Sequence, residues 1–441
     1  MLRFAAISDA FGFRSPNQFR NELLVLLAVC TAGAAWGVFQ FSQFDFVRMC
    51  RGFDLWFDSD PARTVANLSS RWGTFHERST LHPLYSILIA APFGALGDVL
   101  NLPNSTLSAI YVGTQAASLC GMAYVAMRAF AIGRLDAILG LLLLNSTSAV
   151  VYWIGFTEWT VFGSVAILVS VAWIAAPATL RNRVTGLAQN LVSASIVVTN
   201  WPIGVAASLM SDFPKLRWRQ AFQHTRDALA VMAALTVVQY MLFPKAGGFL
   251  NIWSEVGAGA AKMGGSIFSP ILQFFGQTLV APVPGVFDWA SAAPSWGVNI
   301  MASGAQGIPV TPLTIVILAL WVGLWALGIF AAVRGGVSRA VLWFVLGVIG
   351  YLFVFHTVFG YDMFLFSVAF APPLTFVAVW SLRSPYKIVA RVMCVALIAA
   401  SFAHNYPSFQ SAVKTHNAIG SGWLMRAGHP APQEAAETDC R

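Results

Sequence analysis

Long apolar runs separated by short basic clusters dominate this sequence of 441 residues. Most of them approach the roughly twenty residues that an α-helix needs to cross the hydrocarbon core of a membrane. Because no water is available there, the spanning elements must be helices or a closed barrel, and barrel strands would alternate in short patterns instead. We therefore expect an all-α, polytopic bundle of eleven transmembrane helices. The expected spans are 23–41, 106–127, 135–154, 159–177, 184–199, 201–213, 227–244, 311–333, 340–357, 361–381 and 388–404.

The composition supports a membrane location and excludes an ordinary soluble domain. Hydrophobic residues make up 57% of the chain and charged residues only 10%, with a mean hydropathy of +0.69. The net charge of +8 is carried by clusters between apolar runs, which favours contact with anionic lipids over nucleic acid. Five scattered cysteines form no CxxC pair and have no metal-ligand spacing, so neither zinc nor a disulfide framework is indicated. The first twenty residues are polar and basic and do not resemble a cleavable signal peptide, so we expect the first apolar run to remain as an anchor.

Basic clusters define the expected topology, because Lys and Arg accumulate on the cytoplasmic side of a membrane. If the short apolar stretch 83–97 crossed the membrane, Arg128 and Arg134 would lie outside. We therefore interpret 83–97 as an external juxtamembrane helix, with a cytoplasmic N-terminus and an external tail at 405–441. This topology suits a bacterial inner (plasma) membrane protein that is one integral membrane domain. The clusters placed inside are Arg3/Arg14/Arg20, Arg128/Arg134, Arg181/Arg183, Lys215/Arg217/Arg219/Arg226, Arg334/Arg339 and Arg383/Lys387/Arg391.

Two long polar segments are then external, and a short hairpin lies between two of the clusters. The stretch 184–213 must go out and return, so we expect two short helices that meet at Thr199–Pro202, where proline ends the first helix. The external segment 42–105 should carry interfacial helices. The external segment 245–310, rich in Gly, Pro, Ser and Trp, is typical of a structured loop or a lid.

The first external segment concentrates acids and bases in a chain that has few of either. Such groups can activate a hydroxyl nucleophile and hold a phosphate, although a solvated loop would also be polar. Pro61 starts a helix, which makes Asp60 an N-cap candidate, and Val65, Leu68 and Trp72 continue at helical spacing as an interfacial helix to residue 75. The charged residues are Asp45, Asp54, Asp58, Asp60, Arg63, Arg71, His76, Glu77, Arg78 and His82.

Two motifs in this segment resemble those of a known superfamily. An acidic stretch at Asp58–Arg63 follows the first span, and His82–Leu84 opens a second external helix. The order is similar to the "DE" and "PPL" type motifs of the GT-C superfamily of polyprenyl-phosphate-sugar glycosyltransferases. That superfamily includes protein O-mannosyltransferases and lipid A aminoarabinose transferases. Here Ser59 splits the acidic pair, and His82 replaces one of the prolines.

Later parts of the chain extend this resemblance. Phe156–Phe162 resembles the superfamily's external acidic turn before its fourth span, and Thr199–Pro202 is similar to its pair of short helices. Tyr361–Asp362 and Ala371–Pro373 look like a late tyrosine-and-proline span, although Gly360 stands where an arginine is usual. The resemblance covers most of the architecture and about a dozen specific positions.

The resemblance implies roles for individual residues. It makes Asp60 the general base, with a simple helix cap as the alternative, and makes Asp58 the second acid, which could instead orient Arg63 or bind sugar hydroxyls. Arg78 and His82 would hold the carrier phosphate, unless they only anchor the segment at the interface.

Four further residues complete the expected substrate site. Glu158 lies in a short turn between apolar spans and could line the sugar pocket or join Asp60 at a metal. Lys245 is a phosphate candidate that snorkelling would explain equally well. Arg63 and Tyr361 are expected to contact substrate. We predict no metal site and no cofactor, with a divalent cation as the alternative.

The expected function is an inverting glycosyltransferase (EC 2.4 class) of cell-envelope glycan biosynthesis. A polyprenyl-phosphate-linked sugar would be the donor, and a glycan, lipid or protein the acceptor, at the extracytoplasmic face. Membrane lipids are the other expected partners, and nucleic acid is not one. A transporter or flippase is an alternative, but charged residues within the spans are scarce and no repeat is evident. A lipid-linked oligosaccharide polymerase or ligase is another, but residues 245–310 contain no arginine.

Overall fold

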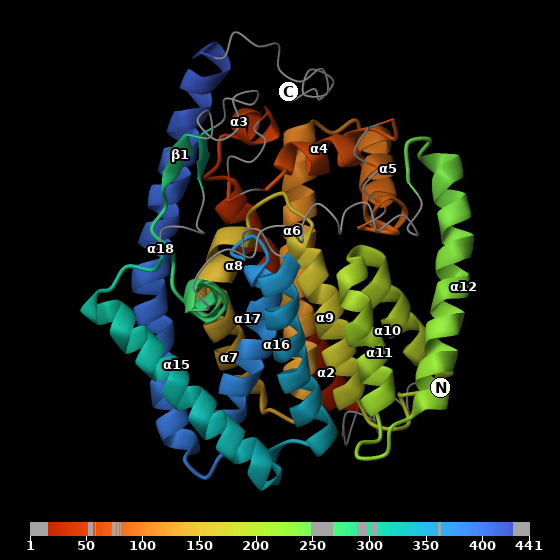
Figure 1. Ribbon diagram of the computed structural model, residues 1–441, viewed down its shortest axis with the longest axis vertical. Coiled ribbons are helices and arrows are strands. Elements are labelled where there is room, and N and C mark those ends of the chain that lie inside the picture. The colour runs from red at the N-terminus through yellow and green to blue at the C-terminus, as the bar shows by residue number, and fades with distance from the viewer. Residues whose placement is uncertain are drawn as a thin grey trace.

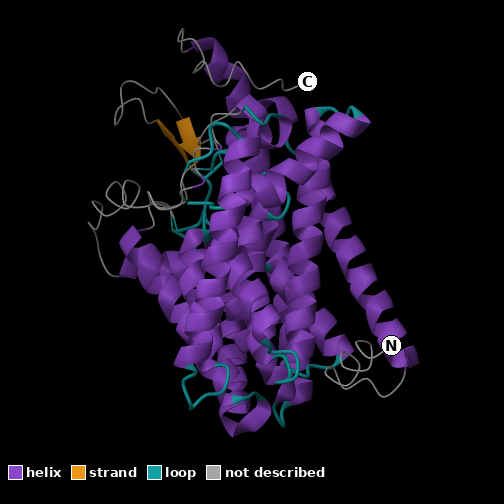
Figure 2. Cartoon of the chain, turned by 90° about the vertical axis from the view of Figure 1, so that its right-hand side faces the viewer, coloured by secondary structure: helices purple, strands orange, loops and turns teal. Residues whose placement is uncertain are grey.

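The computed structural model describes residues 16–51, 56–57, 59–72, 76, 79, 81–247, 268–288, 299–301, 307–359 and 363–426. Nearly all of this part is helical, which confirms the all-α prediction (Figures 1 and 2). The exception among the described residues is a short antiparallel pair, β1 (Val286–Asp288) and β2 (Asn299–Met301). Asp58, Arg78 and Tyr361 lie outside the described residues.

Five of the described helices are long and apolar enough to cross a membrane, as expected of a membrane protein. The predicted number of eleven spans is not confirmed. The five are α2 (Pro16–Phe41), α6 (Asn104–Ala129), α15 (Pro312–Ala331), α16 (Arg339–Phe359) and α18 (Lys387–Arg426). The other elements are α3 (Phe46–Arg51), α4 (Pro61–Ser69), η2 (Ser86–Ala90), α5 (Ala91–Leu100), α7 (Arg134–Ser146), α8 (Ser148–Trp153), α9 (Thr160–Ala175), α10 (Arg183–Ile196), η3 (Val198–Asn200), α11 (Trp201–Met210), α12 (Trp218–Leu242), α14 (Phe268–Ile271), η6 (Leu272–Gln277), η8 (Ala332–Gly336), α17 (Ser367–Val379) and η9 (Trp380–Arg383).

Several predicted spans are shorter or interrupted. The run 135–154 divides into α7 and α8, because the Thr147 side chain accepts a hydrogen bond from the Val150 N–H at 3.3 Å and begins a new helix. The hairpin over 184–213 has the predicted form, with α10 and α11 joined by η3. In the run 361–381, α17 begins only at Ser367.

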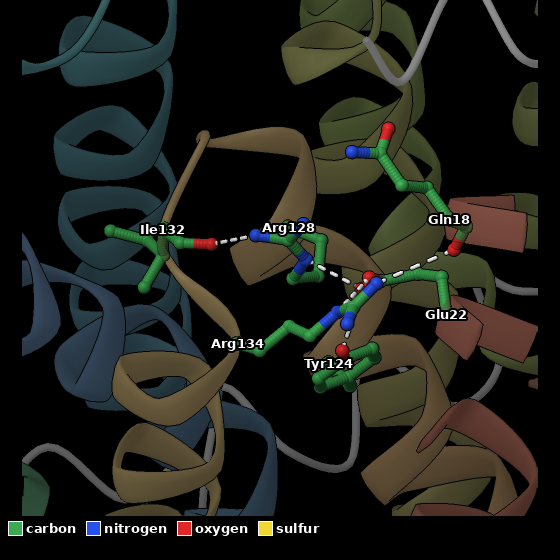
Figure 3. A network of polar contacts seen from close by, with 6 residues as sticks. All are labelled: Gln18, Glu22, Tyr124, Arg128, Ile132 and Arg134. Atoms are coloured by element: carbon green, nitrogen blue, oxygen red, sulfur yellow. Dashed lines mark hydrogen bonds and ion pairs between the residues drawn. The ribbon is translucent and has the colours of Figure 1, made fainter. Parts of the chain in front are cut away.

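Buried ion pairs bring the basic clusters of several helices together at one end of the bundle. The Glu22 carboxylate of α2 accepts hydrogen bonds from Tyr124 and Arg128 at 2.6 Å and from Arg134 at 2.5 Å (Figure 3). Nearby on α7, Asp136 pairs with two cations of α18, both at 2.8 Å. The helices α3, α4 and α5 lie at the opposite, upper end in Figure 1. The expected topology places these basic clusters on one side of the membrane, and the structure is consistent with that.

Glycines allow α2 and α6 to approach closely. A Cβ atom on Gly37 would lie 2.6 Å from the Ala116 Cβ, and one on Gly121 would lie 2.7 Å from the Cys30 Sγ. Association of helices in lipid depends on such close contact, because apolar burial contributes little there. The anchor helix is therefore fixed to α6 by shape along the bundle and by the Glu22 ion pairs at its end.

Two segments predicted as external are partly inside the bundle. Phe274 of η6, within the predicted loop 245–310, is fully buried and stacks on Phe370 of α17 at 4.3 Å between ring centroids. Asn405, within the predicted tail 405–441, donates to the carbonyls of Ser146 at 2.8 Å and Leu279 at 2.9 Å. The helix α18 continues past it to Arg426, so the described part of the predicted tail is helical.

The cysteine prediction was wrong at one position. Cys50, in α3, is disulfide-bonded, whereas Cys30, Cys120 and Cys394 are free. Scattered cysteines give no spacing signal for a single disulfide, so the sequence did not indicate it.

Candidate active site around Asp60 and Glu158

Two buried aromatic side chains anchor the chain just before Asp60. Trp56 and Phe57 are fully buried, and the Phe57 ring contacts Phe364 at 5.0 Å and Tyr152 at 5.5 Å between centroids. Phe57 has a φ of 49°, a left-handed conformation that bulky residues rarely adopt. The aromatic contacts hold the backbone in this conformation and so determine where the following acidic segment begins.

We expect Phe57→Ala to lower the free energy of unfolding by about 3–5 kcal/mol, because it leaves a cavity among buried rings. Phe57→Gly should be more stable than Phe57→Ala by about 1 kcal/mol, the reverse of the usual order, because glycine tolerates a positive φ. Denaturation of the purified protein in detergent measures both differences. Trp72→Ala is the control, since Trp72 is 56% exposed and its loss should change stability little.

Asp60 directly precedes α4, as predicted, but its side chain does not cap the helix. The Asp60 carbonyl accepts from the N–H of Arg63 at 3.1 Å, and its carboxylate Oδ2 accepts from the Arg63 guanidinium at 2.6 Å. Arg63 therefore orients the carboxylate. The helix ends at Ser69 instead of residue 75, with Val65 and Leu68 buried and Trp72 outside it.

Glu158 lies next to Asp60, although the two residues are 98 positions apart. Its side chain is only 2% exposed. One carboxylate oxygen accepts from the Asp60 N–H at 3.2 Å, and the other accepts from the Trp159 N–H at 3.0 Å. The turn before α9 is thus bonded directly to the start of α4, which brings the two predicted acids into one site.

Polar side chains from α6 hold the turn that carries Glu158. Gln115 donates to the Phe156 carbonyl at 2.7 Å, and the Tyr111 hydroxyl donates to the Glu158 carbonyl at 3.4 Å. The Tyr85 hydroxyl donates to Tyr111 at 2.9 Å, which links the turn to the start of η2. Sequence reasoning missed these three residues, and the only signal was the presence of polar groups inside otherwise apolar runs.

His82 belongs to the same neighbourhood but has a structural contact. Its Nδ1 lies 2.9 Å from the Ile196 carbonyl, and its ring lies 4.1 Å from the Trp159 ring. The segment around it also bonds to the apex of the α10–α11 hairpin, through the Val198 N–H and the Leu81 carbonyl at 2.9 Å. His82 therefore joins the hairpin to the turn of Glu158, and its role with phosphate stays a prediction.

Lys245 is not brought next to Asp60. It is exposed, and no ion pair to it is found within the described part of the chain. Nearby in the sequence, the Phe243 ring lies 4.3 Å from the His76 ring between centroids. The Gly247 carbonyl accepts a hydrogen bond from the Ser79 hydroxyl at 2.7 Å. His76 in turn bonds to Ser70 beyond the far end of α4, roughly 14 Å along the helix from Asp60.

Burial depresses the pKa of His76 below its usual value of 6.5, an effect that the Ser70 carbonyl partly offsets. Near and below pH 6.5, the His76 imidazole therefore binds a proton more readily in the unfolded chain than in the folded protein. Stability should be greatest above about pH 6.5 and should fall as pH drops from there towards the lower pKa of the folded state. His76→Gln should have a smaller loss between pH 7 and pH 5, measured by thermal unfolding. Equal losses in both proteins would contradict this.

The tryptophans differ in their availability to a sugar. Trp56 and Trp153 are fully buried, so neither can stack on a ligand in this conformation. Trp159 is only partly buried and lies beside Glu158, which makes it the better candidate. A further residue that sequence reasoning missed is His356, a buried histidine whose ring lies 4.6 Å from Phe366, a neighbour of Trp159. A single histidine in an apolar span gave no distinguishing signal.

The site offers a fixed carboxylate, a guanidinium and a second buried carboxylate at one end of an apolar bundle. No group of three or more His, Cys, Asp or Glu side chains suited to a metal occurs within the described ranges. This observation does not test the prediction that the protein needs no metal or cofactor, which stays a prediction. Comparison of the sequence with protein-family models and with curated proteins found no match.

Proposed function

We propose that this protein is a glycosyltransferase that moves a monosaccharide from a polyprenyl phosphate to a glycan, lipid or protein acceptor at the extracytoplasmic face. The observation that carries the proposal is the contact between Asp60 and Glu158 beside Arg63. It brings two acids and a cation together where the bundle meets the polar segment 42–105. The resemblance to the GT-C superfamily provides the reaction.

The proposed reaction is a single displacement with inversion. The Asp60 carboxylate accepts the proton of an acceptor hydroxyl while that oxygen attacks the anomeric carbon of the sugar. The bond between the anomeric carbon and the phosphate oxygen breaks, and the polyprenyl phosphate leaves with both electrons. Arg78 and His82 would stabilise the charge on the leaving phosphate. Asp58 and Tyr361 would bind sugar hydroxyls, Arg63 orients the base, and the buried Glu158 holds the backbone of Asp60 in place.

An apolar groove is available for the lipid part of the donor. It has a volume of about 930 Å³ and runs between α2, α6, α9 and α10, with Leu26 near one end and Val38 near the other. Ile110 lines the groove and directly precedes Tyr111, whose hydroxyl bonds to the Glu158 carbonyl. A prenyl chain in this groove would therefore end close to the two acids.

Two features support an extracytoplasmic position for the site. The ion-paired cations Arg128, Arg134, Lys387 and Arg391 lie at the opposite end of the bundle, as they would on the cytoplasmic side. Cys50, close in sequence to Asp60, is disulfide-bonded, and disulfides persist mainly in oxidising compartments.

A direct assay tests the function. Purified protein is incubated with synthetic short-chain polyprenyl-phosphate sugars and membrane extracts as acceptor, and release of polyprenyl phosphate is measured. We expect release with at least one monosaccharide donor. Release only from diphosphate-linked oligosaccharides would favour the polymerase or ligase alternative. Movement of intact donor across proteoliposomes without release would favour a flippase.

Labelling of single introduced cysteines tests the orientation. Asp98 of α5 is exposed at the end that carries Asp60, and Arg339 begins α16 at the other end. With Cys30, Cys120 and Cys394 replaced by serine, Asp98→Cys should react with an impermeant maleimide in intact cells. Arg339→Cys should react only after permeabilisation. The opposite pattern would place the site in the cytoplasm and would exclude the proposed reaction.

A further inference from the structure

A second cavity lies at the end of the bundle opposite Asp60, between the start of α10 and the start of α12. It has a volume of about 610 Å³, and its lining includes Arg183, Arg217, Trp218, Arg219 and Gln223. None of these residues takes part in the proposed transfer reaction. Three guanidinium groups around one cavity require an explanation, because like charges repel one another.

The surroundings of the cavity do not neutralise it. Residues 181–227 contain six Lys or Arg and only two Asp. Asp212 pairs with Arg217. Asp227 pairs with Arg183 and with Arg226, both at 2.7 Å. Arg219 makes no ion pair with any other described residue. The cavity is therefore positively charged, with guanidinium donors available to an anion.

Large apolar side chains stand exposed beside these arginines. Trp218 and Phe222 are each 67% exposed, and Leu216 is 45% exposed. The helix α12 stands at the right-hand edge of the molecule in Figure 1, and its lower end lies at this site. Further along the same helix Val237 is 60% exposed, which suits a surface covered by acyl chains. Tryptophan beside arginine is typical of the level of lipid head groups.

We propose that this cavity binds the phosphate head group of an anionic phospholipid from the leaflet at this end. Arginine can donate two parallel hydrogen bonds to a phosphate, and Gln223 adds a neutral donor for the glycerol part of the head group. A small free anion would use the arginines but would leave Trp218 and Phe222 without a partner. A phospholipid uses both, since its acyl chains cover the exposed side chains while its phosphate enters the cavity.

Native mass spectrometry of the delipidated, full-length protein in detergent tests the site. Phosphatidylglycerol and phosphatidylcholine with the same acyl chains are titrated separately. The wild-type protein should bind phosphatidylglycerol about tenfold more tightly than phosphatidylcholine. Each arginine removed should weaken the binding of phosphatidylglycerol about fivefold. The variants are Arg219→Gln and the double variant Arg217→Gln/Arg219→Gln. Arg339→Gln is the matched control, because Arg339 lies at the same end but outside the cavity.

Three results would overturn the inference: equal binding of the two lipids by wild type, an equal loss in Arg339→Gln, or displacement of phosphatidylglycerol by excess inorganic phosphate. The last result would mean that the cavity selects free anions. If the double variant fails to fold, Arg219→Gln alone decides, because Arg219 makes no ion pair with any described residue. A single-variant loss below twofold then counts against the site.

Discussion

Asp60→Asn should reduce sugar transfer by roughly a hundredfold to ten-thousandfold while leaving the protein folded. The amide cannot accept the proton of the acceptor hydroxyl, but it keeps the size and much of the hydrogen bonding of the carboxylate. The initial rate of polyprenyl phosphate release, measured at equal protein concentration, gives the magnitude. Size-exclusion elution and thermal unfolding show whether the fold is retained.

Asp98→Asn is the matched control for this experiment. Asp98 is an exposed acid of α5 at the same end of the bundle, so the same chemical change removes a charge outside the site. We expect its transfer rate to stay within about twofold of wild type, as for surface substitutions in general. Full activity in Asp60→Asn would remove the catalytic assignment, and Asp58 would become the next acid to test.

Glu158→Gln should lower both stability and transfer. The glutamine amide nitrogen cannot accept a hydrogen bond, so the N–H of either Asp60 or Trp159 loses its acceptor in a buried place, at a cost of about 1–3 kcal/mol. The start of α4 would shift, and a displacement of about 1 Å at a reacting group can cost on the order of a hundredfold in rate. Unfolding and the release assay measure the two effects.

Asp136→Asn separates a loss of activity from a loss of stability. Asp136 is also a buried acid, 3% exposed, but it pairs with Lys387 and Arg391 at the other end of the bundle. The Asp136→Asn variant should be less stable than wild type, but its rate of sugar transfer per folded molecule should be unchanged. If Glu158→Gln behaves in the same way, Glu158 is only a structural residue.

The sequence predicted the elements that depend on local chemistry. Pro61 after Asp60 indicated a helix start, and the proline at residue 202 indicated the hairpin between α10 and α11. Both features occur in the structure. The sequence also drew attention to Glu158 through its isolation between apolar runs. It could not show that Glu158 bonds to the Asp60 backbone, because a contact between distant positions leaves no pattern in a single chain.

One error arose because a side-chain hydrogen bond to the backbone can interrupt a helix, which the hydrophobicity of the sequence does not reveal. Residues 135–154 read as one apolar run, but the Thr147 side chain bonds to the backbone and starts a second helix. At the start of the predicted tail, Asn405 bonds to two carbonyls within the bundle and α18 continues past it, while the external position of the tail stays a prediction. Arg63 pairs with Asp60, and its contact with substrate stays a prediction.

The Glu22 ion pairs have a consequence for how the protein is made. The carboxylate leaves the ribosome 106 residues before Arg128, so at typical rates of synthesis it has no cationic partner for on the order of ten seconds. During that interval the first helix must wait at the lipid head groups with its acid solvated. The first helix can reach its final position only after α6 and α7 have been inserted. A nascent chain halted before residue 128 should therefore leave the membrane insertion machinery more slowly than one halted after residue 134.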